Sequence, residues 1–262
     1  MEKYSGKRIV MIGSGNVASQ LSNALLSAGY QVIQVYSRTA AHARALAVTL
    51  NASWTDQVSE ITDQGDIYIL AVVDSALPQL ADQIRIRSQL LIHTSGSVEM
   101  NLFRGKAKNY GVFYPLQTFS KNKPVDFRVI PVAVEGNNKE SENALLHLGH
   151  QVSERVIKLN STDRLHLHLA AVFACNFTNH LYHLASLILD KKNIPFDLLL
   201  PLIHETAGKI RTIHPGEGQT GPAVRNDQIV IKKHLDLLSF SPENRELYDS
   251  LSRSIYSLAH DR

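Results

Sequence analysis

A glycine-rich turn near the amino terminus has the spacing of a phosphate-binding loop. The segment Gly13-Ser14-Gly15-Asn16-Val17-Ala18 has the pattern GxGxxA and directly follows the apolar run Arg8–Ile12. Its first glycine permits a tight turn, its second lets the backbone approach a pyrophosphate, and its alanine lets a following helix pack on the strand. The N-terminus of that helix would offer free N–H groups and a positive dipole end. The expected dinucleotide contacts are Gly13, Ser14, Gly15, Asn16 and Val17, and the alternative is a glycine turn that serves packing only.

The end of the next predicted strand bears on which dinucleotide is bound. The strand expected at Gln31–Tyr36 is followed by Ser37-Arg38-Thr39, with no acidic residue. A carboxylate here would bind the ribose 2′-hydroxyl of NAD, whereas hydroxyls and a guanidinium suit the 2′-phosphate of NADP. We therefore expect Ser37, Arg38 and Thr39 to favour NADP(H). The alternative is that Arg38 is a solvated residue at a helix start.

Two later segments should reach the same edge of the sheet. Ala71-Val72-Val73-Asp74 ends one apolar run, and His93-Thr94-Ser95-Gly96-Ser97 ends the next. Ligands of doubly wound sheets bind beyond the carboxyl ends of the strands, where the strand order reverses. Ser95 is then a candidate catalytic residue near the reacting carbon, although a plain polar turn is the alternative for its segment. The further cofactor contacts expected are Val72, Val73 and Thr94.

The elements that position these residues follow from the periodicity of the chain. Up to about Leu159, short apolar runs alternate with helical stretches, which is typical of parallel strands joined by crossover helices. The strands expected are Arg8–Ile12, Gln31–Tyr36, Asp66–Val73, Gln89–Thr94, Val112–Tyr114, Val129–Val134 and Val152–Leu159. The helices expected between them are Val17–Ala28, Thr39–Leu50, Leu77–Ile84 and Lys139–Leu148.

After residue 160 only helical patterns remain. The helices expected are Arg164 to about Lys191, Leu198–Thr212, Asn226–Leu238 and Glu243–His260. The sequence therefore predicts an α/β fold in two domains. Residues 1–160 would form a doubly wound, mostly parallel Rossmann sheet that binds NADP(H), and residues 161–262 an all-α domain for substrate binding and dimerisation.

The helical half contains three candidate catalytic residues. Asn176 and His180 are four residues apart and so share a helix face. Asn176 could orient a carbonyl oxygen and His180 could donate a proton, or both could satisfy buried packing hydrogen bonds. Arg225 follows the Gly/Pro-rich stretch His214–Pro222 and could anchor a substrate carboxylate, including across a dimer, because its guanidinium matches two oxygens. A structural Arg225–Asp227 interaction is the alternative.

Composition excludes several other functions. Hydrophobic residues make up 44% of the 262 residues and charged residues 19%, so the chain is neither disordered nor low in complexity. The net charge of +3 is too small to indicate a nucleic-acid or membrane surface. Its apolar runs are too short to span a membrane, and no signal-peptide pattern occurs. A single cysteine, Cys175, suits a reducing compartment, so we expect the cytoplasm. The histidines lack metal-ligand spacing, and no metal is expected.

Several motifs together resemble a known family. These are the amino-terminal turn, Ser37-Arg38, HTSGS at 93–97, PLQTF at 115–119 and TGPAVRND at 220–227. The first half resembles the cofactor domains of pyrroline-5-carboxylate reductases and deazaflavin-dependent NADP reductases. Almost the whole chain resembles Rossmann-like NADP oxidoreductases with a helical C-terminal domain of unknown function. Relatives commonly have His where this chain has Tyr114, so the resemblance assigns no general acid to that position.

The resemblance implies an NADP cofactor and, from the wider superfamily, a homodimer formed through the helical domain. Our leading hypothesis is an NADPH-dependent oxidoreductase that reduces a small carbonyl or imine substrate, and Arg225 would suit an acidic one. The rival hypothesis is a catalytically silent NADP(H)-binding protein that senses redox state or scaffolds a partner, because no unmistakable acid or lysine is present.

Overall fold

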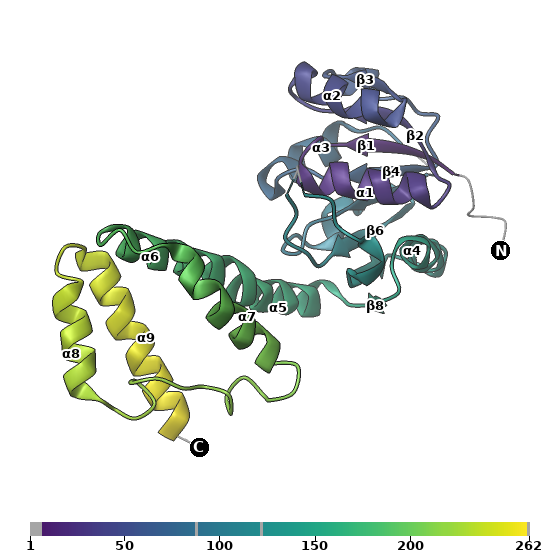
Figure 1. The fold of residues 1–262 in the computed structure, drawn as a ribbon. Coiled ribbons are helices and arrows are strands. Elements are labelled where there is room, and N and C mark those ends of the chain that lie inside the picture. The colour runs from purple at the N-terminus through teal and green to yellow at the C-terminus, as the bar shows by residue number, and fades with distance from the viewer. Residues whose placement is uncertain (1–6, 87–88, 121–122, 261–262) are drawn as a thin grey trace. The chain divides into compact units, whose positions relative to one another are not determined.

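The computed structural model describes residues 7–86, 89–120 and 123–260. The outer limits of the two predicted domains, residues 1 and 262, lie outside these ranges. The chain divides into two compact units, the first ending at Asn176 and the second beginning at Phe177. Figure 1 shows the elements of both.

The first unit contains a doubly wound sheet. Its order within the described residues is β3-β2-β1-β4-β5-β6-β7-β8. The order reverses between β1 and β4, since the chain first winds to one side and then returns to build the other. All neighbouring strands are parallel except β6 and β7. The predicted mostly parallel Rossmann sheet is confirmed. The strands are β1 (Arg8–Ile12), β2 (Gln31–Tyr36), β3 (Ser53–Thr55), β4 (Ile67–Leu70), β5 (Leu90–His93), β6 (Asn109–Pro115), β7 (Val132–Gly136) and β8 (Val156–Lys158).

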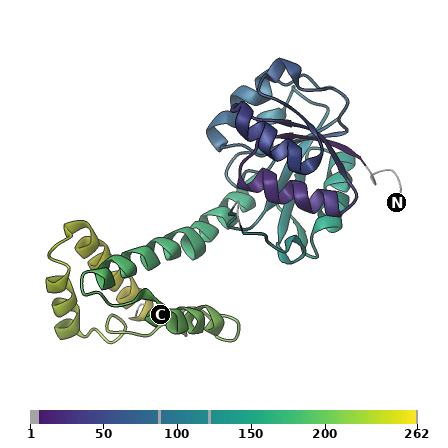
Figure 2. The same cartoon turned by 45° about the horizontal axis from the view of Figure 1, so that its top comes forward.

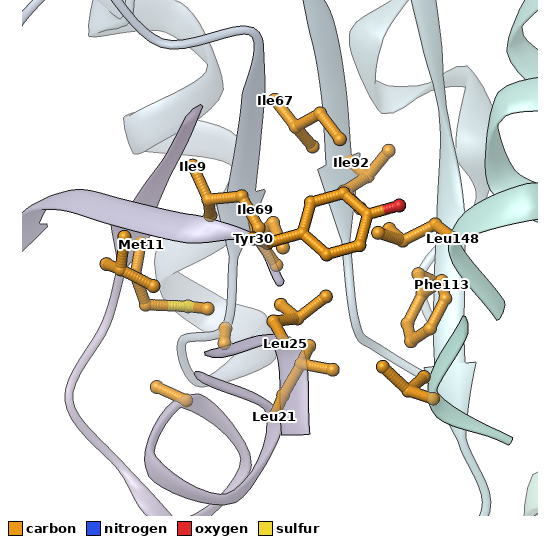
Figure 3. Packing of buried hydrophobic residues seen from close by; sticks show 14 of the residues in the cluster. Ile9, Met11, Leu21, Leu25, Tyr30, Ile67, Ile69, Ile92, Phe113 and Leu148 are labelled. Carbon is orange, nitrogen blue, oxygen red and sulfur yellow. The ribbon is translucent and has the colours of Figure 1, made fainter. Parts of the chain in front are cut away.

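Helices cover both faces of this sheet (Figure 2). One face packs against α1 (Asn16–Ser27), α2 (Ala40–Leu50) and α4 (Lys139–Val152), and the other against α3 (Leu77–Gln83) and the short helix η4 (Met100–Phe103). Alternate residues of each buried strand enter opposite cores, so Ile9 and Met11 face α1 while Val10 faces α3. Figure 3 shows the first of these cores. This double cover leaves the carboxyl ends of the strands as the edge available for a site.

Several features of the first unit differ from the prediction. Strand β3 was not predicted, because three residues are too short to show a periodicity. Val129, predicted to begin a strand, ends the short helix η5 (Phe127–Val129). Val152, also predicted to begin a strand, is the buried last residue of α4. It continues the buried spacing of Leu145 and Leu148, which identifies it as part of the inner face of a helix.

From β8 to residue 260, where the described part of the chain ends, helices are the one type of regular element, as predicted. They are α5 (Ser161–Ala171), the π-helix η6 (Val172–Phe177), α6 (Thr178–Asp190), the short helix η7 (Phe196–Leu199), α7 (Leu200–Lys209), α8 (Gln228–Leu237) and α9 (Pro242–His260). The expected domain limit at residue 160 marks the change from strand to helix. The compact units divide later because α5 is bonded to the sheet through Arg164 and His168. No helix in the described part of the chain has both the length and the apolar character needed to cross a bilayer.

Candidate functional site at the carboxyl edge of the sheet

The turn after β1 requires glycine at its first position. Gly13 has φ +122°, and its N–H donates to the carbonyl oxygen of Tyr36 at 2.8 Å. A Cβ on Gly13 would lie 2.1 Å from the carbonyl oxygen of Ala71. The absent side chain therefore permits both the left-handed backbone and the close approach of the chain leaving β4.

The second glycine of the motif leaves open space. A Cβ on Gly15 would meet no atom within 4 Å, and Gly15 is the N-cap of α1 without a capping side chain. The first turn of this twelve-residue helix therefore directs N–H groups into free space. The open approach and these donors fit the pyrophosphate of a dinucleotide.

A cavity of about 600 Å³ lies beside this turn, at the point where the strand order reverses. It is bounded by the exits of β1, β2 and β4 and reaches Thr94 after β5. Most of its other lining comes from α3 and the turn before it. The predicted cofactor residues that line it are Gly13, Ser14, Gly15, Asn16, Val17, Ser37, Arg38, Val72, Val73 and Thr94.

The corner after β2 carries hydroxyls and a cation. The Ser14 hydroxyl donates to the Ser37 hydroxyl at 2.8 Å, which joins the first turn to this corner. Arg38 is exposed and forms no hydrogen bond or ion pair with the described residues. Thr39 lies outside the cavity lining and is the N-cap of α2, whose end has no side-chain cap. A free guanidinium beside a helix N-terminus suits a phosphate monoester such as the 2′-phosphate of NADP(H).

Asn16 has a contact that the sequence did not reveal. Its Nδ2 donates to the carbonyl oxygen of Phe119 at 2.8 Å, and Nε2 of Gln20 donates to the carbonyl oxygens of Ser120 and Lys123 at 3.0 and 3.2 Å. Two side chains of α1 thus hold the segment that contains the PLQTF motif. The Asn16 side chain therefore binds the segment after β6, and it is the backbone N–H of Asn16, at the open end of α1, that could contact a cofactor.

The exit of β5 is shaped by a buried imidazole and by Ser95. Nδ1 of His93 accepts from the Ser95 N–H at 3.2 Å. Burial, followed by the Arg164 charge, lowers the pKa of His93 to about 4, so its ring is neutral near neutral pH. The Ser95 hydroxyl accepts from the N–H groups of Ser97 and Val98 at 3.1 and 3.0 Å. Ser95, predicted near the reacting carbon, is itself buried and forms the turn.

A tyrosine and a histidine meet beyond this turn. The Tyr114 hydroxyl, at the end of β6, lies 3.0 Å from Nδ1 of His168 on α5. A Cβ on Gly96 would lie 2.7 Å from that same nitrogen and 2.8 Å from Cζ of Tyr114, so the turn packs directly on the pair. The sequence analysis noted Tyr114 but did not connect it with His168. The signal was slight, since 54 residues separate them.

A buried ion pair holds α5 in this position. The Arg164 side chain is 1% exposed, and its Nη1 lies 2.5 Å from Oε2 of Glu135 on β7. Its Nη2 donates to the carbonyl oxygen of Val98 at 2.6 Å, and the Ser161 hydroxyl donates to the Glu135 carboxylate at 2.8 Å. The start of α5 is therefore fastened to β7 and to the turn after β5. His168 is one helical turn further along.

The remaining predicted catalytic residues lie further along the chain. Asn176 is exposed in the π-helix η6, and His180 is exposed in α6. Arg225 is exposed, and no ion pair within the described residues joins it to Asp227, whose carboxylate instead accepts from the Val230 N–H and caps α8. The roles of Asn176, His180 and Arg225 stay predictions. Across the described ranges, no three His, Cys, Asp or Glu side chains are grouped as a metal site would require.

Two families match parts of this sequence. Residues 8–96 match the family described as NADP oxidoreductase, coenzyme F420-dependent. Residues 130–255 match a domain of unknown function, DUF2520. No curated protein matches the chain at a significant level.

Solved structures extend the likeness over the whole chain. A Bacteroides fragilis protein named "putative NADP oxidoreductase" is 45% identical, with a TM-score of 0.92 over 96% of this chain and 98% of its own. The fold is shared by 1-pyrroline-5-carboxylate reductase from Streptococcus pyogenes, 14% identical with a TM-score of 0.63 over 96% of this chain and 98% of its own. It is also shared by an imine reductase from Myxococcus stipitatus in complex with NADP+, 20% identical with a TM-score of 0.63 over 97% of this chain and 93% of its own.

The cofactor-site geometry, the two matched families and the 45% identical relative point to one conclusion, which confirms the predicted family and cofactor. The chain belongs to the NADP oxidoreductases that combine this cofactor domain with a DUF2520 domain, and its cofactor is NADP(H).

Proposed function

We propose that this protein reduces a small carbonyl or imine compound with NADPH. The observation that carries the proposal is the cavity at the strand reversal, which begins at the phosphate-binding turn and reaches Thr94 beside the polar exit of β5. The shared fold of the imine reductase and the pyrroline-5-carboxylate reductase supports the same class of reaction. Both of those enzyme names refer to C=N chemistry.

Different residues along the cavity would contact different parts of the cofactor. NADPH, when bound, supplies a hydride to the substrate carbon. The turn at Gly13 and Gly15 would hold the pyrophosphate, and the corner at Ser37-Arg38-Thr39 the 2′-phosphate. Val72, Val73 and Thr94 would contact the nicotinamide riboside.

At the substrate end, the predicted roles remain part of the proposal. Ser95 would shape the wall next to the reacting carbon, since its hydroxyl already accepts two backbone hydrogen bonds. Asn176 would orient the substrate oxygen or nitrogen, and His180 would donate a proton. Arg225 would bind the carboxylate of an acidic substrate.

The second unit supports a homodimer as part of the same proposal. Among its described residues only Ala223, Ile231 and Leu238 are buried. Large apolar side chains exposed by 60% or more include Leu198, Leu202, Ile229, Leu237 and Leu258. Apolar surface of this extent is typical of a face that another chain covers. Light scattering on the purified protein should therefore give the mass of a dimer, and a monomer would contradict this part of the proposal.

The central experiment measures NADPH oxidation with pyruvate, propionaldehyde and 2-methyl-1-pyrroline, each beside a calorimetric titration of NADPH. We expect binding of NADPH and turnover of at least one carbonyl or imine probe. Binding without turnover of any probe would favour the rival function, a silent NADP(H) sensor. The cytoplasm is the proposed compartment, because a single cysteine suits a reducing environment.

A further inference from the structure

We propose, building on the hydride transfer proposed above, that the Tyr114 hydroxyl is the proton donor of the reaction in place of the His180 suggested by the sequence, and that His168 supplies its proton. Both residues belong to the first unit, and the hydroxyl lies 3.0 Å from Nδ1 of His168. Tyr114 would thus be a catalytic residue and His168 a positioning and proton-supplying residue.

The pair lies next to the end of the cofactor cavity. Strands β5 and β6 are parallel neighbours, and His93 pairs with Val112. Beyond that pairing the chain turns after β5, and a Cβ on Gly96 in this turn would lie 2.8 Å from Cζ of Tyr114. Thr94 of the same segment lines the cavity, so Tyr114 packs against the segment that forms this end of the cavity wall.

The hydrogen bonding of the pair leaves room for a substrate. Among the described residues, His168 is the one hydrogen-bond partner of the Tyr114 hydroxyl, which can form a further bond. Nε2 of His168 forms no hydrogen bond within the described part of the chain, and this side chain is only half-buried. The imidazole could therefore regain a proton from water.

Burial is the main reason why the Tyr114 hydroxyl stays protonated. Burial raises the pKa of Tyr114, and Asp74 and Cys175 raise it further, whereas Arg164 lowers it. The guanidinium of Arg164 is already paired with Glu135, which limits its ability to stabilise a phenolate. A neutral tyrosine near pH 7 is the form that can donate.

The substrate receives one proton from Tyr114, and His168 then replaces that proton. As the substrate carbon gains its new C–H bond, the electron pair of the C=O or C=N bond moves onto oxygen or nitrogen. That atom forms a bond to the Tyr114 proton as the phenolic O–H bond breaks. Protonated His168 then gives its Nδ1 proton to the phenolate oxygen, so the histidine ends neutral and is recharged from solvent.

Three variants separate this role from a packing role. Tyr114→Phe removes only the hydroxyl. His168→Asn keeps an amide donor near the position of Nδ1 but has no proton to release. His166→Asn is the control, since His166 lies on the same helix and its Nδ1 contacts the Thr162 carbonyl oxygen at 2.8 Å instead.

The turnover measurement uses 2-methyl-1-pyrroline and pyruvate with NADPH. We expect Tyr114→Phe to lower kcat about 100-fold or more, the usual contribution of a positioned proton donor, without weakening NADPH binding. His168→Asn should lower kcat and change the alkaline limb of its pH profile, while His166→Asn behaves as wild type. An unchanged kcat in Tyr114→Phe would overturn the proposal. A fourth variant, His180→Gln, tests the alternative donor, and a loss of kcat in this variant alone would assign the proton to His180.

A second readout does not depend on turnover. NMR of isotope-labelled histidines should show that the Nδ1 resonance of His168 changes when Tyr114 is replaced by Phe, whereas that of His166 should not. An unchanged His168 resonance would mean that the two groups do not form this hydrogen bond and would overturn the proposal. If wild-type protein binds NADPH but reduces neither probe, the proposed function fails for these substrates, and this resonance still decides whether Tyr114 and His168 are hydrogen-bonded.

Discussion

Removing the charge of Glu135 should strongly destabilise the first unit. The Arg164 side chain is 1% exposed and that of Glu135 is 15% exposed, so Glu135→Gln leaves a buried guanidinium without its counter-charge. Breaking a buried pair by removing one partner costs about 3–5 kcal/mol. Because Gln keeps one oxygen that can accept from Nη1, we expect about 3 kcal/mol, near the lower end of that range.

Urea unfolding followed by tryptophan fluorescence measures this loss. Trp54 is the single tryptophan of the chain and lies in β3 of the same unit. With a urea dependence of about 2 kcal/mol per molar, the midpoint should fall by about 1.5 M. Protein concentration is held constant, because association alone changes apparent stability.

The control is an exposed pair of the same kind. Arg128 and Glu154 are 3.3 Å apart with side chains 55% and 66% exposed, so Glu154→Gln should cost less than about 1 kcal/mol. Replacing both buried partners, as in Glu135→Leu with Arg164→Met, should restore much of the lost stability, since no uncompensated charge remains. Equal midpoints for Glu135→Gln and Glu154→Gln would refute the assignment of an energetically important buried pair.

Three further predictions concern the pH dependence and the cofactor site. Folding lowers the pKa of His93 from 6.5 to about 4. The contribution of the neutral His93 ring to the free energy of unfolding is therefore fully present above pH 6.5 and is lost as the pH falls toward 4. His93→Asn should remove about 3 kcal/mol of this acid sensitivity in urea titrations, and an unchanged dependence would contradict a neutral buried ring. Gly15→Ala should fold normally yet bind NADPH poorly. Gly13→Ala should unfold at lower urea, because the new Cβ at Gly13 would collide with the carbonyl oxygen of Ala71, whereas a Cβ at Gly15 meets no atom. Arg38→Ala should weaken NADPH binding about 10-fold or more in calorimetry and leave NADH binding unchanged, and an equal loss for both would exclude a 2′-phosphate contact.

Much of the cofactor site could be predicted because it is local in the sequence. The turn at Gly13 and Gly15 depends on backbone freedom and on the helix that follows it, both of which a short segment determines. The corner at Arg38 follows directly from the end of β2. Ser95 was harder, because its residue type allows both a reactive and a turn-forming hydroxyl, and only the structure shows that this hydroxyl accepts two backbone hydrogen bonds.

The short elements could not be predicted from the same patterns. Three residues of β3 are too few for an alternation, and Val152 fits either a helix end or a strand start by its apolar character alone. Packing decided both, since β3 pairs with β2 and Val152 faces the core beneath α4.

The sequence by itself determined the doubly wound fold, the glycine turn after β1 and the hydroxyl and guanidinium groups that follow β2, because each of these arises from neighbouring residues and their periodicity. Only the tertiary structure decided that Tyr114 meets His168 and that Arg164 is buried against Glu135. The order of β5, β6 and β7 and the docking of α5 bring these pairs together across intervals of 54 and 29 residues. No local pattern records such contacts, because they depend on which strands become neighbours when the sheet forms.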